Sequence, residues 1–390
     1  MKHIAMYIGS LNKGGAERVM VNLAEYFYSR GYKVTFVTTF KEDDEYTYSE
    51  GIDRVISGLT PEEEGGRLIN IYRRYAKLRK VWKQIKPDLV LSFLGKNNVM
   101  ALLTTRRLHI PVVVSVRADP KMEYHNYSRF LEFMAFRLFP KAAGVVLQTS
   151  DAAKYFPANI QKKVRIMPNS LSKEFIRPVY SGVREKEVVA VGRIDDNKNH
   201  RMLIDAFAKV WNEHQDWRLT IYGDGPMKEE LQKHVKSLDN ADHDVSLQRS
   251  FDNDIEGSIV ESNKSRIIDA ISFPGRINNV AEKIAASGIF VLCSDTEGMP
   301  NTLLEAMALG IPSISTDCPC GGPKDIIEDG VNGLLVPVRD TEALSKALLK
   351  YMDDEAFAAR VSGEASKIQE KYAPEVVNGM WEEYLCGLMN

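Results

Sequence analysis

The sequence has few cysteines and no long hydrophobic run, and each lack excludes a class of protein. Its 390 residues contain four cysteines (Cys293, Cys318, Cys320 and Cys386), whose spacing matches neither a disulfide framework nor the paired ligands of a zinc site. No apolar run approaches the roughly 18 residues that a membrane-spanning helix needs. The first twelve residues are too short in their apolar part for a signal peptide. These absences predict a protein of the reducing cytoplasm.

The net charge of −2 conceals two halves of opposite charge. Residues 1–180 hold 29 Lys and Arg against 17 Asp and Glu, whereas residues 181–390 hold 22 against 36. A basic half joined to an acidic half indicates that the first half meets an anionic partner. The chain is also too long for one ordinary hydrophobic core, so we expect two domains.

Short apolar runs alternate with helical patterns along the whole chain. Strands are predicted at residues 3–9, 33–39, 87–93, 110–116, 142–149 and 163–169, and again at 187–192, 218–226, 288–294, 310–316 and 332–337. Buried strands that alternate with helices are typical of parallel, doubly wound sheets. The expected fold class is α/β, with two Rossmann-like domains facing a central cleft at the carboxyl ends of their strands.

The predicted domains are residues 1–179 and 187–372, joined by a polar linker at 180–186. Residues 373–390 are expected to form a helix that packs back on the first domain. The polar stretch 239–268 has little periodicity and is interpreted as an insertion. Within it, Asp252-Asn253-Asp254 matches the Asp-x-Asp motif of metal-dependent sugar transferases, but no strand precedes it, so we attribute the match to chance.

Two loops that follow strands carry residues suited to a diphosphate. Gly14 and Gly15 lie between the first strand and a helix, where backbone N–H groups can approach an anion. Arg193 and Lys198 occupy the equivalent loop of the second half and offer a planar fork and a point charge. A simple tight turn and two solvated cations remain the alternatives.

A third loop places two glutamates eight positions apart. Glu297 lies in a Gly/Pro turn, and Glu305 lies inside the apolar helical run that follows. The backbone of Gly298–Leu303 begins that helix and supplies further N–H donors. The carboxylates can bind sugar hydroxyls, although glutamate near a helix N-terminus also simply suits the helix dipole.

Taken together, these stretches resemble the retaining glycosyltransferases of family 4, which have the GT-B fold. The resemblance rests on "GGAER", "VGRIDDNKN", "YGDGP", "PGRINNV" and "EGMPNTLLEAMALGIP", which occur in this order from about residue 2 to the C-terminus, interrupted by the polar insertion. Its most specific element is the pair of glutamates with a helix behind it. The Arg and Lys after the first strand of the second domain add to that specificity.

The resemblance implies a role for each motif. Glu297 would contact the donor sugar and Glu305 the ribose, while Arg193 and Lys198 would hold the diphosphate and neutralise the charge that grows as the glycosidic bond breaks. The other implied binding residues are Gly14 and Gly15 at the phosphates, Arg276 and Ile277 at the base, and Gly298, Met299, Pro300, Asn301, Thr302 and Leu303 in the third loop. From family frequency, the expected nucleotide is uridine.

The resemblance also implies catalysis without a metal or other cofactor, by front-face attack in which the leaving phosphate helps to take the acceptor proton. Asp119 follows the fourth predicted strand and would lie near the acceptor. Many relatives have a histidine close to this loop, where this chain offers Arg117. A contact with an acceptor diphosphate and a structural salt bridge between Arg117 and Asp119 are both open interpretations.

Residues 67–86 contain eight basic residues and no acidic one. An apolar stripe runs along the same segment, formed by Leu68, Ile71, Tyr75, Leu78, Trp82 and Ile85. We expect the stripe to pack on the sheet. The one-signed face, with aromatics and cations at 127–141, indicates docking to anionic lipid headgroups at the inner face of the cell membrane. Nucleic acid is not expected as a partner, because no base-reading module is visible.

The expected function is transfer of a hexose or N-acetylhexosamine from a nucleotide sugar, UDP-linked by family frequency, to a polyprenyl-diphosphate-linked glycan during cell-surface polysaccharide or oligosaccharide assembly. Two other classes share the fold. A GT-B epimerase or phosphorylase is disfavoured by the paired glutamates with Arg193 and Lys198. A non-catalytic partner subunit should lose some of these four residues, and this chain keeps them all.

Overall fold

A computed structural model of the chain describes residues 1–238 and 266–389, which form two compact units. The first unit comprises residues 1–170, 320–322 and 371–390, and the second comprises 171–319 and 323–370. The division between them therefore falls at Ser170/Leu171, ahead of the polar stretch 180–186. The segment 239–265, which contains Asp252 and Asp254, lies outside the described residues.

The first unit is built on a seven-stranded parallel sheet in the order β3-β2-β1-β4-β5-β6-β7. Its strands are β1 (His3–Ile8), β2 (Lys33–Thr38), β3 (Asp53–Ile56), β4 (Leu89–Phe93), β5 (Val112–Ser115), β6 (Gly144–Leu147) and β7 (Val164–Ile166). Strands β1, β4, β5 and β6 are fully buried, as expected for a sheet covered on both faces.

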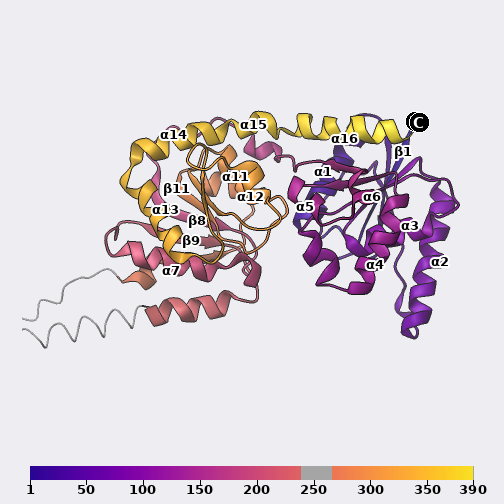
Figure 1. Cartoon of the computed structure of the whole chain (residues 1–390), viewed down its shortest axis with the longest axis horizontal. Helices are drawn as coiled ribbons and strands as arrows, with labels where there is room; N and C mark the ends of the chain where they lie inside the picture. The colour runs from indigo at the N-terminus through magenta and orange to yellow at the C-terminus, as the bar shows by residue number, and fades with distance from the viewer. Residues whose placement is uncertain (239–265, 390) are drawn as a thin grey trace, which may run out of the picture. The chain divides into compact units, whose positions relative to one another are not determined.

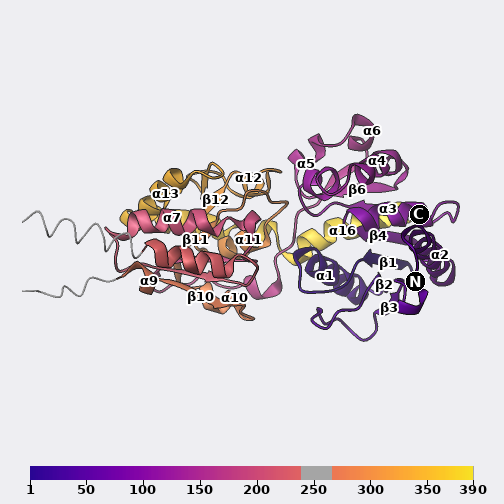
Figure 2. The ribbon, with the colours of Figure 1, turned by 90° about the horizontal axis from the view of Figure 1, so that it is seen from below.

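Helices cover both faces of this sheet (Figures 1 and 2). They are α1 (Gly15–Ser29), α2 (Arg67–Ile85), α3 (Gly95–Thr104), α4 (Arg129–Leu138), α5 (Ser150–Lys154), α6 (Ala158–Gln161) and α16 (Pro374–Leu388), with short turns η1 (Pro61–Glu63), η2 (Lys121–His125) and η3 (Phe139–Lys141). Helix α3 contacts both α2 and α4.

The C-terminal helix α16 belongs to the first unit. Trp381 is fully buried against Phe93 of β4, with ring centroids 6.2 Å apart. The Tyr26 hydroxyl of α1 donates to Glu382 at 2.9 Å. Successive side chains of a strand point to opposite faces of the sheet, so Phe93 and Val90, three positions apart, face opposite sides. Phe93 contacts α16, whereas Val90 belongs to the core beneath α2 and α3. Helix α16 therefore covers the face opposite to α2 and α3.

The second unit repeats the plan with a six-stranded parallel sheet in the order β10-β9-β8-β11-β12-β13. Its strands are β8 (Glu185–Val191), β9 (Arg218–Tyr222), β10 (Ile271–Gly275), β11 (Ser287–Leu292), β12 (Ser313–Thr316) and β13 (Leu334–Val336). The helices and turns are η4 (Lys173–Phe175), η5 (Asp196–Lys198), α7 (His200–Trp211), α9 (Ile267–Ala270), α10 (Val280–Ile284), α11 (Asn301–Ala308), α12 (Gly322–Ile326), α13 (Thr341–Asp353), α14 (Glu355–Ser366) and α15 (Ile368–Lys371).

The predicted fold class is confirmed, and all eleven predicted strands are present. Two edge strands, β3 and β10, were not predicted. Strand β3 is only partly buried, and β10 contains Pro274, so neither shows the apolar run of a central strand. Because β3 adds one strand, Asp119 follows β5 and not the fourth strand.

The prediction that the whole apolar stripe of α2 packs on the sheet is wrong for the first half of the helix. Leu78 and Trp82 are buried, but Leu68 is 81% exposed and Ile71 is 55% exposed. The face is also less one-signed than the sequence indicates, because Glu63 of η1 forms an ion pair with Lys77 at 2.7 Å. The buried residues of α2, Leu78, Val81 and Trp82, all lie in its second half, so its first turns expose their apolar side chains.

Candidate functional site

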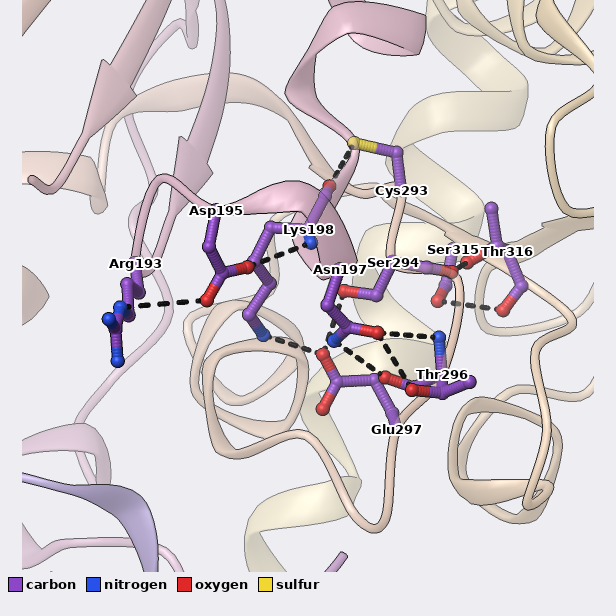
Figure 3. A network of polar contacts seen from close by, with 10 residues as sticks. All are labelled: Arg193, Asp195, Asn197, Lys198, Cys293, Ser294, Thr296, Glu297, Ser315 and Thr316. Carbon is purple, nitrogen blue, oxygen red and sulfur yellow. Dashed lines mark hydrogen bonds and ion pairs between the residues drawn. The ribbon is translucent and has the colours of Figure 1, made fainter. Parts of the chain in front are cut away.

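The loops with the predicted chemistry meet at the point in the second sheet where the strand order reverses. Strands β8 and β11 are neighbours there, although 95 residues separate Val191 from Ser287 and β9 and β10 lie between them in sequence. In open parallel sheets, ligands bind outside the carboxyl ends of strands at this switch point. The loops 192–199 and 293–300 follow β8 and β11, and Figure 3 shows their side chains converging.

The loop after β8 is folded by side-chain caps. The Asp195 carboxylate accepts from the backbone N–H of Lys198 at 3.2 Å and caps η5. Asn199 has a φ of 45°, a left-handed conformation that asparagine tolerates, and its side chain accepts from Met202 N at the start of α7. This sequence of polar residues therefore fixes the backbone from which the Lys198 side chain extends.

Asn197 joins this loop to the loop after β11. Its Oδ1 accepts from Thr296 Oγ1 at 2.7 Å, its Nδ2 donates to Thr296 O at 3.0 Å, and its backbone oxygen accepts from Asp295 N at 2.8 Å. No role was predicted for Asn197, because a polar residue in a polar loop carries no periodic signal. It fixes the position of Glu297 relative to Lys198.

Lys198 and Glu297 form the central ion pair of the site (Figure 3). Lys198 Nζ lies 2.5 Å from Glu297 Oε1, which also accepts from Ser294 Oγ at 2.7 Å. The two side chains are 20% and 14% exposed. Burial opposes the charge of Lys198, but the Glu297 carboxylate outweighs it and holds the pKa of Lys198 above its ordinary value. The ammonium is therefore charged and held in one direction at neutral pH.

Two buried groups, Cys293 and His200, lie close to Lys198 without adding charge. The Cys293 thiol donates to the backbone oxygen of Lys198 at 3.1 Å, and burial raises its pKa to about 12. Burial and the nearby Lys198 charge lower the pKa of His200 to about 4. Both groups are therefore neutral at neutral pH, and Lys198 is the cation in this part of the site.

Arg193 does not share the Lys198–Glu297 contact. Its side chain is 70% exposed, and its Nε lies 3.6 Å from Asp195 Oδ2 (Figure 3). The two cations predicted to act together therefore come from one loop, but the structure pairs each with a different carboxylate. An exposed guanidinium of this kind keeps its donors accessible to solvent.

Three glycines let the loops after β8 and β9 approach closely. Gly223 has a φ of 149°, and a Cβ at this position would lie 1.8 Å from the carbonyl oxygen of Gly192. A Cβ on Gly225 would lie 2.2 Å from the carbonyl oxygen of Ile194. These glycines belong to the motifs "VGRIDDNKN" and "YGDGP", but no role was predicted for them. They determine how tightly the backbone packs beneath Arg193.

The third predicted loop leads into α11 as expected. Gly298, Met299 and Pro300 are buried, Asn301 and Thr302 are half-buried, and Leu303 is buried in the first turn of the helix. Glu305 lies in the second turn and is only 4% exposed. Arg276 and Ile277 follow β10, two strands away from β8 in the same sheet, with Arg276 exposed and Ile277 half-buried.

In the first unit, Gly14 and Gly15 lie at the N-terminus of α1. Gly14 is the N-cap residue, and the Glu17 side chain folds back so closely that a Cβ on Gly14 would lie 2.2 Å from its Oε2. Burial raises the pKa of the Glu17 carboxyl. The turn lies between β1 and α1 as predicted. The Glu17 carboxyl group lies beside Gly14, where the sequence predicts a bound phosphate.

The structure contradicts a salt bridge between Arg117 and Asp119. Arg117 is 9% exposed, donates through Nη2 to Asn169 Oδ1, and lies over the Phe93 ring with its Cζ 4.9 Å from the centroid. Asp119 instead accepts from Lys121 N at 2.9 Å, in the turn that leads into η2. The turn after β5 directs the two side chains apart, because Asp119 serves the backbone of the following turn.

Glu123, which was not predicted, is buried beside Arg117 and accepts from its backbone N–H at 3.3 Å. Burial lowers the pKa of the Arg117 guanidinium to about 9 and raises that of the Glu123 carboxyl to about 8. At neutral pH the arginine is therefore charged while the glutamic acid is largely neutral. This leaves a net positive charge at the carboxyl edge of the first sheet.

Among residues 1–238 and 266–389, no three His, Cys, Asp or Glu side chains gather in an arrangement that could hold a metal ion. The four cysteines are free thiols. The Asp252-Asn253-Asp254 motif lies outside the described residues.

Known protein families match almost the whole chain. The family described as "Glycosyltransferase Family 4" matches residues 13–175, and families described as "Glycosyl transferases group 1" match 172–257 and 252–354. Among curated relatives, a Campylobacter jejuni enzyme is 26% identical over 393 residues and covers all of both chains. It is named "GalNAc-alpha-(1->4)-GalNAc-alpha-(1->3)-diNAcBac-PP-undecaprenol alpha-1,4-N-acetyl-D-galactosaminyltransferase".

A second relative, the amylovoran biosynthesis glycosyltransferase AmsD of Erwinia amylovora, is 25% identical and covers 98% of this chain and 99% of its own. Two solved structures share the fold. HepE of Anabaena, in complex with UDP, has a TM-score of 0.75 at 17% identity and covers 99% of this chain and 100% of its own. Sucrose-phosphate synthase of Thermosynechococcus elongatus has a TM-score of 0.79 at 17% identity and covers 100% and 99%.

The two parallel sheets and the site at the switch point define a GT-B glycosyltransferase. The chain carries domains that match the Glycosyltransferase Family 4 and Glycosyl transferases group 1 models, and it is a hexosyltransferase.

Proposed function

We propose that the protein is a retaining transferase that moves a hexose or N-acetylhexosamine from a UDP-sugar to a lipid-linked glycan, without a metal ion. The observation that carries the proposal is the Lys198–Glu297 pair at the switch point of the second sheet. It places a fixed ammonium beside a carboxylate, next to a helix N-terminus. The ammonium suits a diphosphate, and the carboxylate can accept hydrogen bonds from sugar hydroxyls.

In this proposal the second unit binds the donor. Lys198 and the exposed Arg193 stabilise the negative charge that develops on the diphosphate as the glycosidic bond breaks. Glu297 accepts hydrogen bonds from the sugar, and Glu305 accepts from the ribose. The leaving phosphate helps to take the acceptor proton, and the acceptor oxygen attacks from the same face, which retains the anomeric configuration.

The names of two relatives support the acceptor. Two Campylobacter jejuni enzymes that resemble this chain are named for undecaprenol-linked diphosphate acceptors. In the first unit, Arg117 supplies a buried positive charge that suits such a diphosphate. We propose that Arg117 and Asp119 lie on the acceptor side, where Asp119 contacts acceptor hydroxyls.

The surface of the first unit supports a peripheral association with an anionic membrane. Exposed apolar side chains and cations gather on α2, η2 and α4, a surface we call the basic–aromatic face. Its exposed apolar residues are Leu68, Ile69, Ile71, Tyr72, Met122, Tyr127, Phe130 and Phe133. Apolar side chains among cations are typical of segments that lie in the membrane interface. No helix in the described parts of the chain is long and apolar enough to cross a bilayer.

UDP is expected to raise the thermal transition of the protein equally in EDTA and in manganese, because the proposed diphosphate contacts are Lys198, Arg193 and backbone N–H groups. At a UDP concentration of 100 times Kd, the stabilisation should be about 2.7 kcal/mol. Glu305→Ala should lose most of this shift. A shift or a turnover that depends strictly on added metal would contradict metal-independent catalysis.

A second measurement tests the membrane association. The purified protein should float with vesicles that contain anionic lipid at low salt and stay behind at high salt, since each cation near the surface contributes about 1 kcal/mol. Floating should be lost when Arg73, Arg74, Lys77 and Lys80 are changed to glutamine. The matched control changes four exposed lysines elsewhere, Lys41, Lys162, Lys233 and Lys236. If both variants float alike, the basic–aromatic face is not the docking surface.

Product analysis separates this proposal from the other GT-B activities. Transfer of sugar to a lipid-linked acceptor supports it, whereas conversion of the UDP-sugar without any acceptor would indicate an epimerase. Binding of UDP with no product from any acceptor would indicate a non-catalytic subunit.

A further inference from the structure

A cavity of about 370 Å³ lies in the first unit, at the opposite edge of the sheet from Gly14 and Arg117. It is enclosed by the end of α3, the turn 105–111 that leads into β5, and the end of α4 (labelled in Figure 1). We call it the amino-edge pocket. Its volume is within the range of about 300–1,000 Å³ that is usual for small-molecule sites. The proposed transfer reaction does not use it.

The pocket has a cationic rim over an apolar floor. Arg106, Arg107, His109 and Lys141 supply the rim and are exposed, while Leu102, Val112 and Leu138 are buried in the floor. No acidic residue of the described chain lines the pocket, and none pairs with the rim cations. Four basic groups that lack acidic neighbours favour an anion, and the floor beneath them favours an attached apolar chain.

The backbone of the rim is held in a conformation that its side chains disfavour. Arg107 has a φ of 63° and His109 a φ of 58°, so two non-glycine residues within three positions are left-handed. Arg79 of α2 fixes this turn by donating to Thr104 O at 2.7 Å and to Arg106 O at 2.8 Å. Such strain persists where the surrounding structure imposes it and is concentrated at ligand-binding segments.

The pocket is lined in part by the end of α4, a helix that also carries part of the basic–aromatic face. Helix α4 ends in the pocket at Leu138 and exposes Phe133, at 63%, five residues earlier, which is about 7.5 Å along the helix. Helix α2, whose first half carries the exposed apolar side chains, holds the rim through Arg79. An anionic amphiphile at the proposed membrane surface could therefore place its charged group on the rim and its apolar chain on the floor.

We propose that the amino-edge pocket binds one acidic phospholipid, with its phosphate on Arg106, Arg107 and Lys141 and the start of an acyl chain against Leu103 and Leu138. The inference rests on the proposed membrane association and adds a defined lipid site to it. A free phosphate would use the rim alone, whereas a lipid uses the rim and the floor.

Binding is best measured by calorimetry on the full-length protein, with short-chain phosphatidylglycerol kept below its micelle concentration. Short-chain phosphatidylcholine tests the anion, and glycerol phosphate tests the chain. We expect phosphatidylglycerol to bind and the other two to bind at least about tenfold more weakly. Phosphatidylcholine lacks the net negative charge for the rim, and glycerol phosphate lacks the acyl chain for the floor. Equal binding of phosphatidylcholine, or of glycerol phosphate, would overturn the proposal.

Two variants locate the site. Changing Arg106, Arg107 and Lys141 together to glutamine removes the rim charge, and Leu103→Trp fills the pocket without changing charge. Each should weaken phosphatidylglycerol binding by about tenfold or more. A control with Lys41, Lys162 and Lys236 changed to glutamine should bind within about twofold of wild type. If both pocket variants bind like wild type, the lipid does not occupy this pocket.

Sugar transfer to a lipid-linked acceptor and UDP binding are measured on the same samples. If these are intact while phosphatidylglycerol does not bind, the lipid pocket alone is refuted. If transfer itself is absent, the proposed function fails independently of the pocket.

Discussion

Replacing Lys198 with alanine is expected to lower kcat by roughly two to three powers of ten, or about 2.7–4 kcal/mol of transition-state stabilisation. The reason is the fixed position of its ammonium, 2.5 Å from Glu297 and 20% exposed at the switch point. A charge held in place before the reaction stabilises the growing diphosphate charge without further reorganisation. Steady-state kinetics with a UDP-sugar and a lipid-linked acceptor would measure the loss.

Companion variants separate charge from packing. Lys198→Arg keeps the charge and should recover part of the rate. Arg193→Ala should also lower kcat, because the exposed guanidinium on the same loop is the other cation proposed to contact the diphosphate. Glu297→Ala should mainly slow sugar transfer, and Glu305→Ala should mainly weaken nucleotide binding. Near-normal turnover in all four alanine variants, at Lys198, Arg193, Glu297 and Glu305, would refute this assignment of the site.

The second large effect concerns folding. Gly223→Ala is expected to destabilise the second unit by about 3 kcal/mol or more, because both sterics and backbone conformation oppose the new side chain. Its Cβ would lie 1.8 Å from Gly192 O, a backbone atom that cannot rotate away, and φ is 149°. Urea denaturation of the purified protein, or insolubility on expression, would report the effect.

Gly330→Ala is the matched control. Gly330 also has a positive φ, of 74°, but a Cβ there would meet no atom within 4 Å. It should cost only the roughly 1–2 kcal/mol of a left-handed alanine. If Gly223→Ala is no more destabilising than Gly330→Ala, the loops after β8 and β9 do not need their close approach.

The sequence by itself determined the fold class and the loops that carry chemistry. Period-two and period-3.6 patterns, together with short buried runs, are local properties, so they predicted eleven strands and the places where loops follow them. The turn at Glu297 and the buried helical position of Glu305 follow from the same local signals, namely Gly and Pro followed by an apolar helical run. Edge strands β3 and β10 lack that signal, because an edge need not be apolar.

The tertiary structure alone decided which side chains meet. Strands β8 and β11 become neighbours through the crossover of the sheet, so the pairing of Lys198 with Glu297 and the bridge from Asn197 to Thr296 join residues 99 apart in sequence. No local pattern encodes such contacts. The same holds for Arg117, which is directed to Asn169, 52 residues further on, while Asp119 accepts from the backbone of Lys121. Burial along α2 also depends on which elements the fold packs against it, so Leu78 is covered and Leu68 is not, although both belong to the same apolar stripe.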